Sequence, residues 1–171
     1  RVGAGPGQSG NVHCPVGMMA ERRLDRLVNP LVSGLPAFLA ADSGVCSGFM
    51  IAQYTAVSLV AENRRLAGPA SLDGGITSAL QEDDISHATP AALKLLGILE
   101  NTERILAIEL LAAAQAYDLR PEDGGRAQGT DAVYQAVRSV VGPYADDRPL
   151  AGDMECAFNM ICRSTPAQSS P

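Results

Sequence analysis

Aromatic side chains are scarce in this sequence. Its 171 residues include no tryptophan, three phenylalanines and four tyrosines, so that aromatics make up only 4% of a chain that is 46% hydrophobic. The core must therefore be built from alanine, leucine, isoleucine and valine, a composition that favours helices. A chain of this length forms one domain or part of a larger one, and it can bury about two-thirds of its unfolded surface.

Dense positive charge is also missing. Twelve arginines accompany a single lysine, no basic run is longer than a pair, and the net charge is −6. Proteins that follow the phosphates of nucleic acid need clustered basic residues, so we expect no nucleic acid partner. No apolar run approaches the roughly 20 residues that span a bilayer, and the first ten residues, RVGAGPGQSG, contain no apolar signal core. We therefore expect a cytoplasmic protein with no membrane partner.

Cysteine pairs of the kind that bind zinc or exchange disulfides are absent as well. The four cysteines do not have the spacing of such a pair: Cys14, Cys46, Cys156 and Cys162. Because the chain has only two histidines, a metal site that uses His13 and Cys14 is the weaker alternative to free thiols. We expect reduced cysteines and no metal.

Turn residues and apolar periodicity divide the chain into three regions. Residues 1–17 are rich in glycine and aperiodic, and they are predicted to form an irregular entry segment. Residues 18–120 are predicted to form a helical bundle, and residues 121–171 a linker, two short helices and a frayed tail. The helices are expected over residues 18–28, 49–66, 90–118, 130–141 and 153–162.

The third of these helices is the longest. Thr89 and Pro90 suit its first turn, and at 1.5 Å per residue a helix that continues to Asp118 is about 40 Å long. Its second half is apolar nearly all the way round, with Glu109 and Gln115 as the polar exceptions. Such a helix must be covered on several sides, which places it at the centre of a bundle or at an oligomer interface. The predicted fold is an all-α, elongated helical bundle with one long central helix.

The longest polar interruption, PASLDGGITSALQEDDISHA, covers residues 69–88. Loops of this length in a compact protein are usually functional or mobile. The loop contains Gln81 and Glu82, and a carboxylate in a partly dry pocket can accept a proton or bind an amine or imidazole. The alternative is that Glu82, Asp83 and Asp84 form a solvated, acidic start to the next helix, which the helix dipole favours without any function.

A family resemblance covers residues 48–120. The segments GFMIAQYTAVSLVAEN, SALQEDD and ENTERILAIELLAAAQAYDLR closely resemble the C-terminal half of histidine ammonia-lyases and their aromatic amino acid lyase relatives. The resemblance implies non-oxidative elimination of ammonia from L-histidine or an aromatic L-amino acid. It also implies a homo-oligomer, a tetramer in the family, whose sites are assembled from several subunits and whose partner helices would cover the long apolar helix.

The resemblance assigns roles to four residues. Glu82 would be catalytic, because histidine-specific relatives carry glutamate in the QED motif, and Gln81 would bind substrate. Phe49, in SGFMIAQ, would line the substrate pocket, with a place in the core as the equal alternative. Asn11, in GNVH, would hold the substrate carboxylate through its amide, unless it is an ordinary turn residue.

The chain departs from this family in three places. Leu80 and Asp84 stand where relatives carry an amide and an imidazole, and Pro15 runs almost directly into Glu21, where relatives have an additional helix. The tripeptide Ala-Ser-Gly, from which the family makes its methylidene-imidazolone prosthetic group, occurs nowhere in the 171 residues. No cofactor is therefore expected to form in this chain.

Three interpretations follow from these observations. The principal one is a truncated or divergent ammonia-lyase that is inactive alone. The second is one half of a split lyase, whose partner chain carries the missing half. The third is a non-catalytic helical assembly that reuses the fold to bind an amino-acid-like small molecule.

Overall fold

The computed structural model describes residues 6–72, 75–82, 85–120, 125 and 127–164, without the side chains of residues 6–13 and 164. Its elements are α1 (Pro6–Val28), α2 (Pro30–Ser33), η1 (Ala37–Leu39), α3 (Met50–Leu66), η2 (Ala70–Leu72), η3 (Ser78–Leu80), α4 (Ala88–Asp118), α5 (Gln128–Arg138) and α6 (Ala151–Ser164). In these residues there is no strand, and the only β-type pairing is an isolated bridge between Thr77 and Glu82. The predicted all-α class is confirmed.

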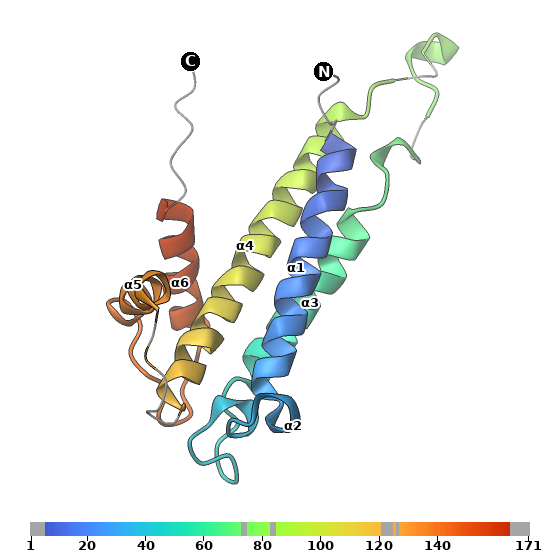
Figure 1. The fold of residues 1–171 in the computed structure, drawn as a ribbon. Coiled ribbons are helices and arrows are strands. Elements are labelled where there is room, and N and C mark those ends of the chain that lie inside the picture. Colours follow the sequence, from blue (N-terminus) through green and yellow to red (C-terminus); the bar gives the residue numbers. More distant parts are fainter. Residues whose placement is uncertain (1–5, 73–74, 83–84, 121–124, 126, 165–171) are drawn as a thin grey trace.

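Three long helices form an elongated bundle. Helices α1, α3 and α4 run side by side, while α5 and α6 pack on the other side of α4, beside its C-terminal half (Figure 1). Helix α4 contacts α1, α3, α5 and α6, so it is the central helix of the fold. The predicted bundle around one long helix is confirmed.

Helix α1 begins at Pro6, so residues 6–17 are helical and the prediction of an irregular entry segment is wrong. Glycine and the interior Pro15 both disfavour a helix, which is why the sequence predicted a start at Met18. Packing against α4 outweighs these preferences. Buried residues recur along α1 at helical spacing: Cys14, Gly17, Ala20, Leu24 and Val28. A Cβ on Gly17 would lie 3.2 Å from Cδ1 of Ile105, so glycine allows α1 to approach α4 closely.

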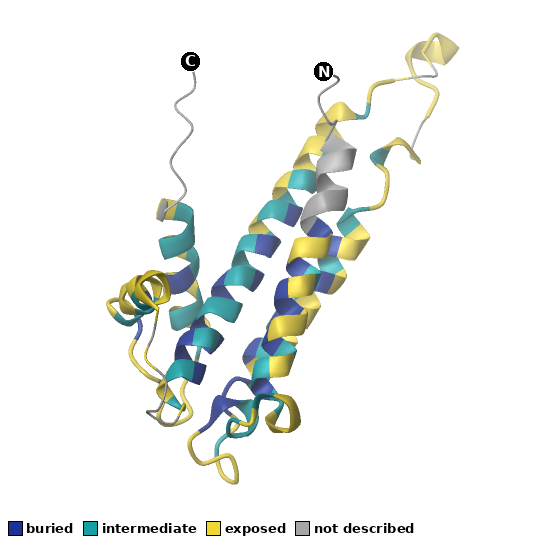
Figure 2. Cartoon of the chain, viewed as in Figure 1, coloured by how far each residue is buried: buried dark blue, intermediate teal, exposed yellow. Residues whose placement is uncertain are grey.

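The apolar half of α4 is covered by helices of the same chain. Ile105, Ile108, Leu111 and Ala112 are each at most 2% exposed. Figure 2 shows dark blue, buried segments along α4 and along the helices beside it. Helices α1, α3 and α6 supply most of this cover. The apolar half of α4 therefore lies at the centre of a bundle, which is one of the two placements expected from the sequence.

The other helix boundaries follow the prediction closely. Helix α4 begins at Ala88, just before the predicted Pro90, and ends at Asp118. Its first turn contains no acidic residue, so Glu82 is not part of an acidic helix start. The two short helices predicted near the C-terminus are α5 and α6. Of the predicted tail, residues 163–171, the first two residues belong to α6 and the rest lies outside the described residues.

Ion pairs fasten α6 and α5 to α4. Arg104 of α4 donates to Glu155 of α6 at 2.9 Å. At the end of α4, the carboxylate of Asp118 accepts hydrogen bonds from the Tyr134 hydroxyl and the Arg138 guanidinium of α5, each at 2.5 Å. The side chains of Arg138 and Asp118 are only 11% and 20% exposed, so solvent screens this pair less than an ordinary surface pair.

Among the helices that the structure describes, none combines the length and apolarity needed to cross a membrane. The four cysteines are free thiols, of which Cys14 is buried. Burial raises the pKa of the Cys162 thiol, which packs beside Glu103.

Candidate functional site

The predicted catalytic residue, Glu82, lies in the loop that joins α3 to α4. The backbone N–H of Thr77 donates to the carbonyl of Glu82 at 2.7 Å, and the N–H of Glu82 donates to the carbonyl of Thr77 at 3.3 Å. The Thr77 hydroxyl also lies 3.4 Å from the Glu82 carboxylate. Gln81 and Glu82 are both exposed, so within one copy this carboxylate faces solvent. Asp83 and Asp84 lie outside the described residues.

The turn just before Gln81 has a strained backbone. Ser78, Ala79 and Leu80 have φ angles of 53°, 55° and 72°, in the left-handed region that residues other than glycine rarely adopt. Each such residue costs about 1–3 kcal/mol, and strain of this kind clusters at binding and catalytic sites. Leu80, which stands where the family carries an amide, is 83% exposed. The turn therefore presents an apolar side chain and a carboxylate together at its surface.

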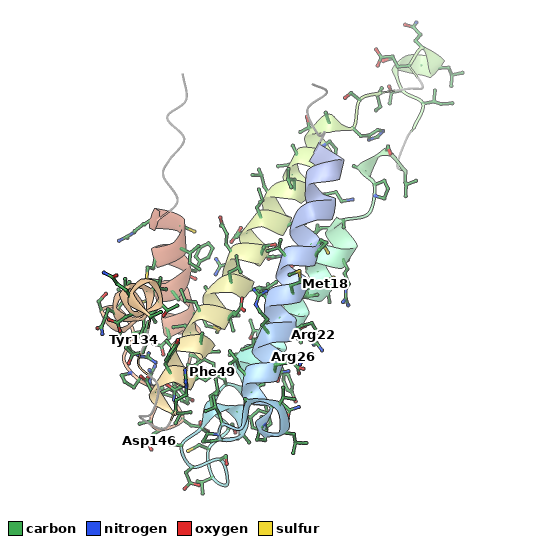
Figure 3. The ribbon with its side chains drawn as sticks, in the orientation of Figure 1. Met18, Arg22, Arg26, Phe49, Tyr134 and Asp146 are labelled. Carbon is green, nitrogen blue, oxygen red and sulfur yellow. The ribbon has the colours of Figure 1, made fainter. Side chains whose placement is uncertain are left out.

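Phe49 lies at the other end of α3, just before Met50 (Figure 3). Its ring is 3% exposed and meets the Tyr144 ring edge-on, with the centroids 5.6 Å apart. The adjacent Gly48 has a φ of +54°, and a Cβ there would lie 2.4 Å from the carbonyl oxygen of Phe38. That oxygen accepts the N–H of Phe49 at 2.8 Å, so the turn needs glycine. This burial is what the core alternative for Phe49 predicts.

Gln115 holds this end of the bundle together from inside the core. Its side chain is buried, and its amide nitrogen donates to the carbonyls of Tyr144 at 2.7 Å and Leu39 at 3.3 Å. Its amide oxygen accepts the N–H of Tyr144 at 2.9 Å. Because a buried polar group is costly unless it is paired, these bonds fix two loops against α4.

The carboxylate of Asp147 closes the same turn from the surface. It accepts the N–H of Ser47 at 2.7 Å and the N–H of Gly48 at 2.9 Å, and the Tyr144 hydroxyl lies 3.2 Å away. The hydrogen bonds from Ser47 and Gly48 lower the pKa of Asp147, whereas burial raises the pKa of Tyr144. A residue 100 positions away in the sequence thus holds the turn that precedes α3.

A cavity of about 560 Å³ opens beside this turn. It is lined by Ser47, Gly48, Ile51, Ala52, Tyr144, Asp147, Arg148, Pro149, Leu150, Ala151 and Met154. Its charged groups already have partners, since Asp147 binds the turn and Arg148 pairs with Asp153. The cavity offers an apolar floor but no uncommitted charge, so it is not where we place the chemistry.

The predicted site residues do not meet in one copy of the chain. The loop with Gln81 and Glu82 extends from one end of the bundle, and Phe49 lies at the opposite end (Figure 1, Figure 3). Helix α3 lies between them, and its 17 residues span about 25 Å at 1.5 Å per residue. Asn11 belongs to α1, but its side chain is not among those described.

Within residues 6–164, and excepting the undescribed positions, no group of three side chains is arranged to hold a metal ion.

Sequence reasoning did not assign a role to Gln115, Tyr144 or Asp147. The sequence contains one indication that Gln115 is structurally important, because it is a polar residue in an otherwise apolar stretch of helix. Nothing in the sequence indicates the roles of Tyr144 and Asp147, because their partners lie far away in the sequence.

Comparison with known families gives a match over most of the chain. Residues 10–139 match a model of the aromatic amino acid lyases. The chain belongs to the aromatic amino acid lyase family. The resemblance drawn from the sequence is confirmed, and the match includes both the Glu82 loop and the Phe49 turn.

Histidine ammonia-lyases are among the relatives of this lyase chain. The enzyme of Natranaerobius thermophilus is 56% identical over 145 residues, which are 84% of this chain and 28% of that protein. The human enzyme is 48% identical over 144 residues, which are 84% of this chain and 22% of that protein. The chain therefore spans between a fifth and a third of the length of these relatives.

Solved structures show the same fold. Histidine ammonia-lyase from Trypanosoma cruzi superposes with a TM-score of 0.80 at 44% identity, over 86% of this chain and 29% of that chain. Tyrosine aminomutase from Streptomyces globisporus superposes with a TM-score of 0.85 at 36% identity, over 95% of this chain and 33% of that chain. The helical bundle is thus a portion of the lyase and aminomutase fold.

Proposed function

We propose that these residues form the helical, Glu82-bearing part of an ammonia-lyase site and do not eliminate ammonia on their own. One observation carries the proposal: the Glu82 carboxylate is exposed beside a strained turn at one end of the bundle, whereas Phe49 lies at the opposite end. The substrate class would be L-histidine or an aromatic L-amino acid, as in the family.

Glu82 is suited to the acidic side of such a site. Its carboxylate has one side-chain contact in the described structure, the Thr77 hydroxyl at 3.4 Å, so most of its lone pairs are available. Once another protein surface covers it, the carboxylate can bind an imidazole or ammonium group, or accept a proton from the substrate. Gln81 would add an amide beside it.

A second protein surface is needed to complete the site. The separation of about 25 Å between the ends of α3 is far beyond hydrogen-bond reach, so Glu82 and the Phe49 end cannot line one pocket within one copy. Two copies side by side in opposite directions would bring these ends together. A homo-oligomer, or a partner chain that carries the missing half, meets this requirement.

The prosthetic group would have to come from outside these residues. Its precursor, Ala-Ser-Gly, is absent from the 171 residues, and no side chain present here can replace a backbone-derived electrophile. The residues present therefore do not fit the formation of the group. They fit the support and charge of a site in which the group is supplied by another segment.

A non-catalytic role is the second candidate. The Phe49 ring is buried against Tyr144, and the exposed Leu80 has replaced a polar residue of the family motif. The first feature turns away from substrate a ring that the family resemblance places in the pocket, and the second removes an amide of the family motif. A helical assembly that binds an amino-acid-like molecule through Glu82 accommodates them without any reaction.

The first test is an assay of the pure chain. L-histidine, L-tyrosine and L-phenylalanine are incubated with it, and the ultraviolet absorbance of urocanate, coumarate and cinnamate is followed. We expect no product, and turnover by the chain alone would overturn the proposal. A rise in melting temperature with L-histidine that is lost in Glu82→Gln, but kept in the matched surface variant Glu100→Gln, would favour the binding role.

A further inference from the structure

Helix α5 does not pack tightly against α4. It presents Thr130, Val133, Tyr134 and Val137 along one face, but only Val137 is fully buried. A cavity of about 220 Å³ lies between this face and α4. The hollow is on the side of α4 opposite to α1 and α3, so it is separate from the Glu82 loop (Figure 1).

Small side chains create this cavity. On the α4 wall, Ala113 and Ala114 occupy the middle, and on the α5 wall Gly129 and Thr130 face the same space. None of these side chains is long enough to fill the gap between two helices whose axes normally lie 8–10 Å apart. Gly129 and Thr130 are exposed, so the cavity opens to solvent at the N-terminal end of α5.

Two tyrosine rings form part of the wall. Tyr117 and Tyr134 stand edge to face with their centroids 6.1 Å apart. The Tyr134 hydroxyl donates to Asp118 at 2.5 Å, so its polar group is already bound by that carboxylate. The same carboxylate accepts Arg138 at 2.5 Å. These bonds hold the C-terminal half of α5 on α4.

The chemistry of the wall restricts the occupant. The lining contains no Asp, Glu, Lys, Arg or His, and burying a charge without a partner is strongly unfavourable. An apolar cavity of about 150 Å³ is sufficient for benzene. Aromatic rings prefer edge-to-face contact with another ring, which the two tyrosines offer. The occupant should therefore be small, uncharged and aromatic.

We propose that the α4–α5 cavity is a binding site for a small, neutral aromatic molecule, independent of the lyase site. Toluene is the probe, and benzoate is its charged control. In the full chain, toluene should shift the methyl resonances of Leu110, Val133 and Val137, with a Kd in the millimolar range or below. Benzoate should bind at least about tenfold more weakly, because its carboxylate has no partner in the wall.

Two variants that fill the cavity test its location. Thr130→Leu enlarges an exposed residue of α5, and Ala113→Val enlarges the α4 wall. Each should weaken toluene binding about tenfold or more, whereas Ala136→Leu on the outer face of α5 should stay within twofold of the parent. Circular dichroism confirms that each variant is folded.

The proposal is overturned by any of three results. Toluene at its aqueous saturation could leave the three sets of methyl resonances unchanged. Both filling variants could bind toluene as well as the parent does. Benzoate could bind as tightly as toluene, which would show that the contact is not with this apolar wall.

Discussion

Replacement of Gln115 by methionine should destabilise the protein more than any conservative change on the surface. Methionine nearly keeps the volume of glutamine but has no amide. The N–H and carbonyl of Tyr144 would lose bonds of 2.9 and 2.7 Å, and the Leu39 carbonyl would lose a weaker one of 3.3 Å. All three backbone groups would lose their partner at residue 115, which is buried and only 2% exposed.

The magnitude follows from the two short bonds. A buried polar group left without a partner costs about 1–3 kcal/mol, so two such groups cost about 4 kcal/mol together. That is a large share of the roughly 5–15 kcal/mol by which a native domain is stable. For a chain of this size, about 1 kcal/mol shifts the melting temperature by about 2–4 °C, so Gln115→Met should lower it by about 8–16 °C.

Urea unfolding followed by circular dichroism measures the loss. Gln135→Met, on the exposed side of α5, is the matched control and should stay within about 0.5 kcal/mol of the parent. A value for Gln115→Met within about 1 kcal/mol of that control would refute the reasoning, because it would show that the amide does not hold the two loops.

Three further changes test other parts of the structure. Gly48→Ala should cost well over the roughly 1–2 kcal/mol of a left-handed alanine, because its Cβ would meet a carbonyl oxygen at 2.4 Å; Gly34→Ala, with nothing within 4 Å, should cost only that amount. Asp147→Asn should flatten the acid limb of the melting temperature against pH. The pKa of this carboxyl is lower in the folded state, so its stabilisation is complete above the usual pKa of about 3.9 and is lost as pH falls through the folded value. Gly17→Val should destabilise by about 1–3 kcal/mol more than Gly152→Val, which meets nothing within 4 Å.

Each of these has a contrary result. Equal urea midpoints for Gly48→Ala and Gly34→Ala would mean that no clash forms at the turn. Melting profiles of Asp147→Asn and the parent that run parallel below about pH 5 would mean that the carboxylate does not stabilise the turn at Ser47 and Gly48. Equal losses for the two valine variants would contradict the close approach of α1 to α4.

Local periodicity was sufficient to predict most of the bundle. The apolar spacing and the flanking turn residues located α3 and α4 to within two residues, and α5 and α6 to within three. They did not locate the start of α1, because the glycines and Pro15 argue against a helix locally. The buried series from Cys14 to Val28 had helical spacing, but its significance depends on contact with Ile105, far along the chain.

The residues of the candidate site likewise differ in whether the local sequence could reveal them. Glu82 could be singled out because the motif Gln81-Glu82-Asp83 is a local signal that resembles the QED motif of the family. Asp147 could not, because a carboxylate in a short loop binds this turn only when folding brings it to Ser47 and Gly48.

The most direct test of the central claim is a chimera. Residues 10–139 of this chain replace the matching segment of the Natranaerobius thermophilus histidine ammonia-lyase, and urocanate formation is measured with Glu82 intact and with Glu82→Gln. If Glu82 is the acidic group of the site, Glu82→Gln should lower kcat/KM by about 100-fold or more, while Glu100→Gln leaves it unchanged. Equal activity with and without the Glu82 carboxylate, or a folded chimera without activity, would contradict the account.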